Sequence, residues 1–184
     1  MKARVIIVAS MLMVAGCGSS PTTHFYTLEP VPGGQSAVRA DVPIVVGHVD
    51  LPGELDRQSL VTHGGGTTIK VSDQDRWAAP LDELVRRALT GDLRTRLPSA
   101  TVLAPGDPVP KNARTLTVNV RRFMADAAGR VTLDADWVVQ GHGAPAASRQ
   151  ASVQVAANGD SADAITVAMS QALGQLADQV AVAL

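Results

Sequence analysis

The chain has 184 residues, a formal net charge of −1 and only 3% aromatic residues. This near-neutral balance, with so few aromatic side chains, disfavours nucleic-acid binding, which depends on basic patches and base stacking. The length suits one domain with its own core, and the single cysteine, Cys17, has no partner for a disulfide.

Residues 1–16 have the layout of a secretory signal peptide. Lys2 and Arg4 precede an apolar run, and small residues lead to Cys17. The apolar run is about half of the ~20 residues that span a bilayer, so a permanent transmembrane helix is not expected. The sequence VAGC at residues 14–17 resembles a bacterial lipobox, which implies cleavage before Cys17 and its acylation with diacylglycerol and a fatty acid such as palmitate. The alternative is an ordinary signal peptide with a chance cysteine.

The residues after Cys17 predict where the protein is held. Two or more acyl chains give stable anchoring. Gly18 occupies the position where, in enterobacterial lipoproteins, an aspartate causes retention in the inner membrane. We therefore expect the periplasmic side of the outer membrane rather than the inner membrane. Residues 17–24 are interpreted as the lipidated cysteine and a polar tether that reaches at most about 25 Å, and residues 25–184 as the domain.

The first part of the domain predicts short strands separated by turns. We expect a strand at residues 24–28, a loop at 29–42 and a buried strand at 43–50. Residues 60–63 and 67–71 flank three glycines and predict a hairpin. A phosphate-binding loop would need a helix after the glycines, whereas a β-like run follows here.

Residues 80–97 predict an amphipathic helix. Leucine, valine and alanine recur at steps of three and four residues, Pro80 suits the first turn and Pro98 ends the helix. Because the other face mixes both charge signs, packing on a core is favoured over binding to lipid. The charged side chains expected on that other face are Asp82, Glu83, Arg86, Arg87, Asp92, Arg94 and Arg96.

The second part predicts a sheet and a second helix. Apolar and polar residues alternate over residues 115–121, 131–140 and 150–155, which indicates an antiparallel meander with one dry and one wet face. A helix capped by Asp160 or Ser161 follows, with apolar residues on one face through to the end of the chain. We therefore predict an α+β fold, in which a mixed, largely antiparallel sheet has two long helices packed on one face.

No motif predicts a catalytic site, a metal site or a cofactor. The four histidines show no metal-ligand spacing, and His142 is expected in an exposed hairpin loop. No GxSxG motif is present. Asp134 and Asp136 share the wet face of one strand about 7 Å apart, a spacing that paired catalytic carboxylates could use. Solvated surface charges explain them equally well, and we do not expect an enzyme.

Several stretches together resemble one family. They are FYTL at residues 25–28, residues 44–49 leading into LPGELDRQSLVTH, RWAAPLDELVRRAL at 76–89, and a later strand bearing Trp137. The chain resembles the ABC-type transport auxiliary lipoproteins, the PqiC/YmbA-like group of membrane integrity-associated lipoproteins. The most specific element is RWAAPLDELVRRAL, and the resemblance covers essentially the whole chain after Cys17.

The resemblance implies a non-catalytic accessory subunit of an MCE/ABC-type lipid transport or envelope-integrity system. Its implied partners are an MCE-domain (PqiB-like) protein and a membrane reached through the lipid anchor, and a homo-oligomer is compatible with this role. Two alternatives remain open. One is a structural lipoprotein that assists assembly of another outer-membrane complex. The other is a periplasmic lipid-binding protein, which would need an apolar cavity between helices and sheet.

Three residues are candidate partner contacts: Tyr26, His63 and Trp77. Phe25 and Tyr26 point to opposite faces of a strand, so one is expected in the core and the other as an exposed anchor. Trp77 has a favoured alternative, packing between the helix entrance and the sheet. His63 stands where the family often has an arginine, which would make a contact there weaker or pH-dependent. The exposed sheet edges could also accept a partner strand.

Overall fold

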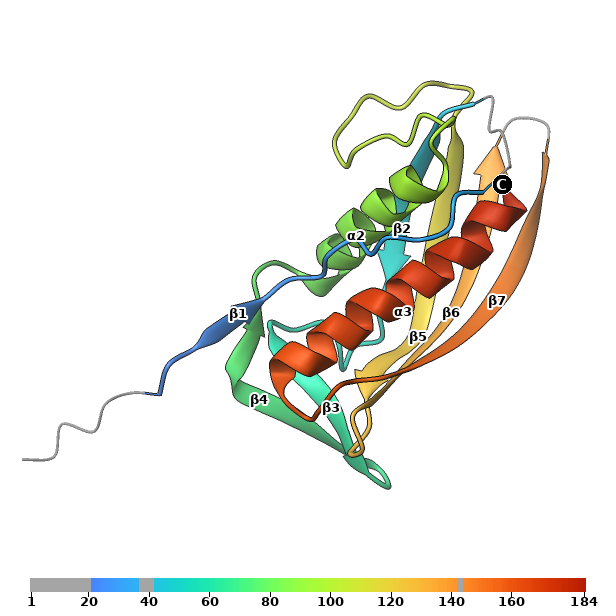
Figure 1. The fold of residues 1–184 in the computed structure, drawn as a ribbon. Helices are drawn as coiled ribbons and strands as arrows, with labels where there is room; N and C mark the ends of the chain where they lie inside the picture. Colours follow the sequence, from blue (N-terminus) through green and yellow to red (C-terminus); the bar gives the residue numbers. More distant parts are fainter. Residues whose placement is uncertain (1–20, 37–41, 142–143) are drawn as a thin grey trace, which may run out of the picture.

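Figure 1 shows the structure, a computed structural model that describes residues 21–36, 42–141 and 144–184. The predicted signal peptide, Cys17, the first tether residues and His142 lie outside the described residues. Two long helices lie side by side over one face of a sheet, and a smaller sheet stands at one end. No helix in the described part of the chain combines the length and the apolar character needed to cross a bilayer.

The larger sheet has four strands in the order β2-β5-β6-β7. Strands β5 (Arg114–Ala125), β6 (Arg130–Gly141) and β7 (Ala144–Ala156) form the predicted antiparallel meander. Strand β2 (Ile44–Asp50) lies parallel to β5 at the edge. The alternation predicted from the sequence is present, because every second residue is buried in β5 from Leu116 to Val120 and in β6 from Val131 to Trp137. These residues are Leu116, Val118, Val120, Val131, Leu133, Ala135 and Trp137. A register shift after Val120 ends the alternation in β5.

The smaller sheet contains the predicted glycine hairpin. Strands β3 (Ser59–Gly65) and β4 (Thr68–Trp77) are antiparallel, and their turn uses Gly65 and Gly66 at φ of 100° and 58°. Both strands are longer than predicted, and β1 (His24–Tyr26) adds to β4 in parallel. The predicted α+β fold, with a mixed, largely antiparallel sheet and two helices, is confirmed. The prediction did not separate a second sheet: the hairpin belongs to the connection between the parallel strands β2 and β5 and forms a sheet of its own with β1.

The two predicted helices are α2 (Leu81–Arg96) and α3 (Ala162–Ala183). Pro80 stands directly before α2, and the Ser161 hydroxyl caps α3 by accepting a hydrogen bond from the Ala164 N–H at 3.2 Å. One prediction for α2 is wrong. Asp92 and Arg96 were expected on a solvated face, whereas they are 0% and 2% exposed. A segment distant in the sequence covers them.

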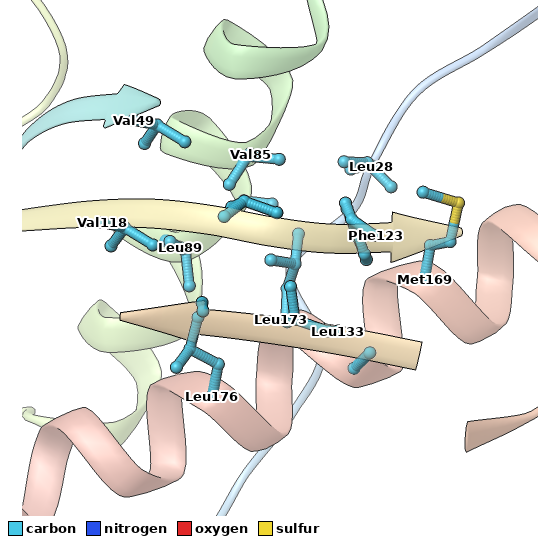
Figure 2. Packing of buried hydrophobic residues seen from close by; sticks show 14 of the residues in the cluster. Leu28, Val49, Val85, Leu89, Val118, Phe123, Leu133, Met169, Leu173 and Leu176 are labelled. Atoms are coloured by element: carbon cyan, nitrogen blue, oxygen red, sulfur yellow. The ribbon is translucent and has the colours of Figure 1, made fainter. Parts of the chain in front are cut away.

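The core lies between the helices and the larger sheet. In Figure 2, Leu89 of α2, Leu173 and Leu176 of α3, and Val118 and Leu133 of the sheet belong to one buried cluster. The apolar stripes predicted for both helices are buried throughout. They comprise Leu81, Leu84, Val85, Ala88, Leu89, Leu93 and Leu97 in and after α2, and Ile165, Met169, Leu173, Leu176 and Val180 in α3.

Residues 27–36, here called the strap, cover the outer side of the helix pair. Residues 29–36 were predicted as part of a loop, whereas Thr27 and Leu28 were predicted to end the first strand. None of residues 27–36 has regular secondary structure, so β1 is shorter than predicted. The strap nevertheless runs alongside α2 and α3 over most of their length, on the side away from the larger sheet (Figure 1). The strap explains why a polar stretch of α2 is buried.

Candidate functional site

The strap is held to both helices by hydrogen bonds along its length. The Glu29 N–H donates to the Ser170 hydroxyl of α3 at 3.2 Å. Near the other end, the Ser36 N–H donates to the Arg96 carbonyl at 2.7 Å, and the Ser36 hydroxyl donates to the Ala181 carbonyl at 3.3 Å. The segment that follows the predicted tether is therefore an integral part of the domain.

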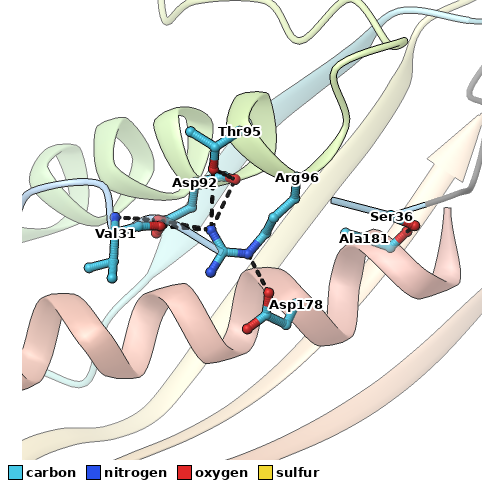
Figure 3. A network of polar contacts seen from close by, with 7 residues as sticks. All are labelled: Val31, Ser36, Asp92, Thr95, Arg96, Asp178 and Ala181. Carbon is cyan, nitrogen blue, oxygen red and sulfur yellow. Dashed lines mark hydrogen bonds and ion pairs between the residues drawn. The ribbon is translucent and has the colours of Figure 1, made fainter. Parts of the chain in front are cut away.

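A buried network centred on Arg96 fixes the middle of the strap (Figure 3). The Val31 N–H donates to Asp92 Oδ1 at 2.7 Å, and Arg96 Nη1 donates to the Val31 carbonyl at 3.0 Å. Arg96 Nη1 also contacts Asp92 Oδ1 at 3.3 Å, and Arg96 Nε donates to Asp178 of α3 at 2.6 Å. The Arg96 network, comprising Val31, Asp92, Arg96 and Asp178, thus joins the strap and both helices through one guanidinium group.

Glycines let the strap approach the helices closely. A Cβ at Gly91 of α2 would lie 2.3 Å from Pro30 Cγ, and a Cβ at Gly33 would lie 2.3 Å from the Arg96 guanidinium. At Gly174 of α3 the nearest atoms would be 3.2 Å away, at Arg96 Nη2. A glycine within a helix normally costs about 1 kcal/mol of stability relative to alanine. Close packing of the strap explains why α2 nevertheless has a glycine at position 91.

Gly91→Ala is expected to destabilise the protein, although the same change stabilises most helices. The overlap with Pro30 must displace the strap, and overpacking of this kind costs about 1–3 kcal/mol. Urea unfolding measures the change in the free energy of unfolding. Gly174→Ala is the matched control in α3, since its added Cβ needs only a few tenths of an ångström of relief. A Gly91→Ala protein as stable as the wild type would contradict this packing.

Asp92 is a buried acid with an incomplete set of partners. Burial raises its pKa to about 6, against the opposing effects of the Val31 N–H and the Arg96 guanidinium, which lower the pKa. Its Oδ2 atom is buried and has no hydrogen-bond partner among the described residues. The folded protein therefore binds this proton more tightly than the unfolded chain, in which the pKa is near the ordinary value of 3.8.

The raised pKa of Asp92 predicts a pH dependence of stability. The contribution of this group is fully present below about pH 4 and is lost as the pH rises through about 6. Asp92→Asn keeps the Oδ1 acceptor and removes the titration. Relative to this variant, the wild type should lose on the order of 2 kcal/mol of unfolding free energy between about pH 4 and about pH 7. Urea unfolding across this range tests it, and parallel pH profiles would contradict it.

A groove of about 530 Å³, here called the strap groove, lies where the strap leaves β1 and passes the first turns of α3. Phe25 and Val167 line it and are 66% and 52% exposed. Tyr26 also lines it but is partly buried against the core, so Phe25 and Tyr26 do differ in exposure as expected for adjacent strand residues. Partial burial and the nearby Asp75 carboxylate raise the pKa of the Tyr26 hydroxyl.

A second depression, the hairpin cleft, contains His63. It has a volume of about 420 Å³ and lies between the β3–β4 hairpin, the β5–β6 turn and the start of α3. His63 Nδ1 accepts a hydrogen bond from the Gly65 N–H at 3.1 Å. Across the cleft, hydrogen bonds from the Arg130 and Ala128 N–H groups lower the pKa of Asp126. The cleft therefore presents a carboxylate that stays ionised near the imidazole.

The structure brings two of the three candidate contact residues together. Tyr26 on β1 and Trp77 on β4 are register partners, whereas His63 lies opposite Ile69 nearer the hairpin turn. Trp77 is 3% exposed and belongs to the core, which agrees with its packing alternative. Its side chain is therefore closed to a partner, while Tyr26 and His63 line surface depressions.

Asp134 and Asp136, the paired carboxylates on the solvent-exposed face of β6, interact with side chains of the neighbouring strands. Asp136 accepts two hydrogen bonds from Arg121 Nη1, at 2.6 and 2.8 Å. Asp134 accepts a hydrogen bond from the Ser152 hydroxyl at 2.7 Å and lies 3.8 Å from Arg122. These cross-strand pairs stabilise the sheet surface. Within the described ranges, no group of three or more histidine, cysteine or acidic residues could hold a metal ion.

Comparison with known proteins identifies the family. The model of the ABC-type transport auxiliary lipoprotein component matches residues 26–181. The chain belongs to this family. The match begins at Tyr26, the last residue of β1 and one of the residues that line the strap groove, and it covers the strap, strands β2 to β7, α2 and most of α3.

Two proteins are similar to this family member in sequence, and two solved structures are similar to it in fold. The intermembrane transport lipoprotein PqiC of Escherichia coli K12 is 26% identical over 141 residues, which cover 75% of this chain and 74% of the relative. PqiC of Shigella flexneri matches to the same extent. A crystal structure of an uncharacterized protein has a TM-score of 0.75 at 22% identity and covers 88% of this chain and 97% of its own. A crystal structure from Xanthomonas campestris has a TM-score of 0.67 at 16% identity, covering 86% and 92%.

Proposed function

We propose that this family member is a lipid-anchored, non-catalytic accessory subunit of an MCE/ABC-type (PqiB-like) intermembrane lipid transport or envelope-integrity system. The observation that carries the proposal is the family match over residues 26–181, directly behind a lipobox-like sequence that ends at Cys17. The similarity to PqiC, described as an intermembrane transport lipoprotein, supports the same role.

The proposed place of the protein is the periplasmic side of the outer membrane. Cys17 carries the acyl chains, residues 17–24 form the anchor and the tether, and residues 25–184 form the domain. Gly18 at the sorting position favours the outer membrane over the inner one. In this arrangement the subunit fixes the periplasmic end of an MCE-domain protein at the membrane.

A docking role fits the chemistry of the described surface. The paired carboxylates of β6 are engaged, Asp136 with Arg121 and Asp134 with the Ser152 hydroxyl. The two depressions combine apolar and polar side chains. His63 in the hairpin cleft and Tyr26 in the strap groove are the proposed partner contacts. Trp77 supports both from the core, because it is the register partner of Tyr26 and ends the strand that forms the hairpin.

Affinity capture of the full-length protein from solubilised membranes tests the proposal, with Cys17→Ser as the unlipidated control. We expect mass spectrometry to identify an MCE-domain protein with the wild type, and expect Cys17→Ser to leave the membrane fraction. Recovery of an outer-membrane assembly protein would favour a structural lipoprotein. Recovery of lipid alone would favour a lipid-binding protein. Either result would overturn the transport-accessory role.

The contact residues are tested in the same capture experiment. His63→Ala and Tyr26→Ala should each lower partner recovery. His48→Ala is the matched control, because His48 is an exposed histidine on β2 that pairs with Asp50 at 2.9 Å, away from both depressions. Unchanged recovery with Tyr26→Ala would remove Tyr26 from the interface, and equal losses for His63→Ala and His48→Ala would remove His63.

A further inference from the structure

We propose that the end of the domain bearing the strap groove rests on a lipid surface, with Phe25 and Val167 inserted at the boundary between zwitterionic headgroups and acyl chains. The membrane contact of the protein would then include a face of the folded domain in addition to the acyl chains. This inference depends on the proposed lipidation of Cys17, and it adds an orientation that the family match does not supply.

The strap sets the distance between the domain and the anchor. If residues 27–36 were free, the chain between Cys17 and the first residue of β2 could extend over about 90 Å. The Arg96 network and the Ser36 hydrogen bonds prevent this, because they fix the strap to both helices. Only residues 18–23 remain between Cys17 and β1, and they reach about 25 Å at full extension. The β1 end of the domain must therefore stay close to the membrane.

Two of the exposed large apolar side chains lie at that same end. Phe25 projects from β1 and Val167 from α3, and both line the strap groove. Figure 1 shows the start of α3 at the end of the molecule where β1 lies, and the C-terminus at the opposite end. Single exposed apolar residues are common on protein surfaces. Two of them on facing elements of one groove, beside the point where the tether enters, form a surface that can bury apolar area in lipid.

The charges around the groove indicate the class of lipid. Glu29 and Asp163 line it, and no lysine or arginine is among its described lining residues. A basic residue near an anionic membrane gains about 1 kcal/mol, and acidic residues gain no such attraction. Zwitterionic headgroups are therefore the expected contact. An anionic surface should repel this face.

The experiment uses the full-length lipidated protein in zwitterionic vesicles. Cys17 is the only cysteine and its thiol is blocked by acylation, so a cysteine introduced by Phe25→Cys or Val167→Cys accepts a polarity-sensitive fluorophore at one site. Val182→Cys is the matched control. It is an exposed valine of the same helix, 75% exposed, and lies 15 residues or about 22 Å further along α3.

The expected result is a blue-shifted emission at positions 25 and 167 that brominated acyl chains quench, while the probe at position 182 stays water-exposed and unquenched. Replacing part of the zwitterionic lipid with anionic lipid should weaken the quenching. Equal water exposure at 167 and 182 would overturn the inference. So would a blue shift without lipid quenching, because another protein surface would then cover the groove.

The same preparation separates this inference from the proposed anchor. Intact mass and labelling of the wild-type protein report whether Cys17 is acylated, since a free Cys17 thiol would itself take the fluorophore. A wild type that accepts the label would overturn the anchor and with it the lipid contact. The lipid contact alone would be overturned if the wild type resists labelling and stays on the vesicles while the probes of the two cysteine variants, at positions 25 and 167, remain exposed to water.

Discussion

Arg96→Ala is expected to lower the free energy of unfolding by about 3–5 kcal/mol. The change leaves the Asp92 carboxylate, which is 0% exposed, without its cation, and it removes the donor to the Val31 carbonyl. Removing one member of a buried ion pair is costly because the other charge stays buried and unpaired. Urea unfolding well above pH 6, where the wild-type carboxylate of Asp92 is ionised, measures the effect.

Arg87→Ala is the control for Arg96→Ala. Arg87 also pairs with an acid four residues away in α2, at 2.6 Å from Glu83, but the two side chains are 54% and 41% exposed. An exposed pair of this spacing contributes about 0.3–0.5 kcal/mol. Adding Asp92→Asn to Arg96→Ala should recover part of the loss, because the unpaired charge is then removed. If Arg96→Ala costs no more than Arg87→Ala, the Arg96 network does not stabilise the fold.

Leu173→Ala is expected to cost about 2–5 kcal/mol, the range for leucine truncation in a packed core. Leu173 of α3 is 0% exposed and belongs to the same buried cluster as Leu133 of β6 (Figure 2). Leu133 of β6 is paired with both neighbouring strands, with Phe123 of β5 and Val153 of β7, so the sheet beneath Leu173 cannot move far to refill the space. Thermal and urea unfolding measure the change, with circular dichroism as the check that the helices persist.

Val182→Ala is the control on the same helix, and its 75% exposure predicts an effect within about 0.5 kcal/mol. Equal effects of Leu173→Ala and Val182→Ala would show that α3 does not pack on the sheet through the stripe that contains Leu173. The comparison also separates loss of buried area from the small difference in helix propensity between the original residues and alanine.

The predictions that the structure confirms rest on local periodicity. Alternation over β5, β6 and β7 indicated a sheet with one buried face, and apolar steps of three and four indicated α2 and α3. Such patterns record which face of one element is dry, and that information lies within the element itself. The capping serine at position 161 is of the same kind, since its hydrogen bond reaches only three residues along the chain.

The predictions that failed depend on contacts between distant segments. Asp92 and Arg96 belong by helical phase to the polar face of α2, and nothing near them in sequence shows that the strap covers this face. The contact of Val31 with Asp92 spans 61 residues. Gly91 and Gly174 were the available signal of close packing on these helices, because each glycine interrupts an otherwise favourable helical sequence. The division into two sheets was missed for a related reason, since β1 and β2 each pair in parallel with strands far along the chain.

The candidate site, too, depends on contacts between distant segments that the sequence does not show. The sequence placed Phe25 and Tyr26 on opposite faces but could not decide which one is exposed, because that depends on how β1 docks against β4. Trp77 was correctly assigned a packing alternative from its size and its place before a helix. The two depressions combine residues from three or more elements, so no local pattern predicts them.

The course of the strap also determines how the domain bears mechanical load. Tension on the N-terminus acts along β1, which is parallel to β4, and then along a segment whose contacts advance from Ser170 to Ala181 in the direction of the α3 axis. These bonds are loaded together in shear and do not open one after another. If the acyl chains are attached at Cys17, a pull from the membrane reaches both helices before it reaches the larger sheet. The hairpin cleft receives the same pull through β1, because Asp75 of β4, which lines the cleft, is the register partner of His24.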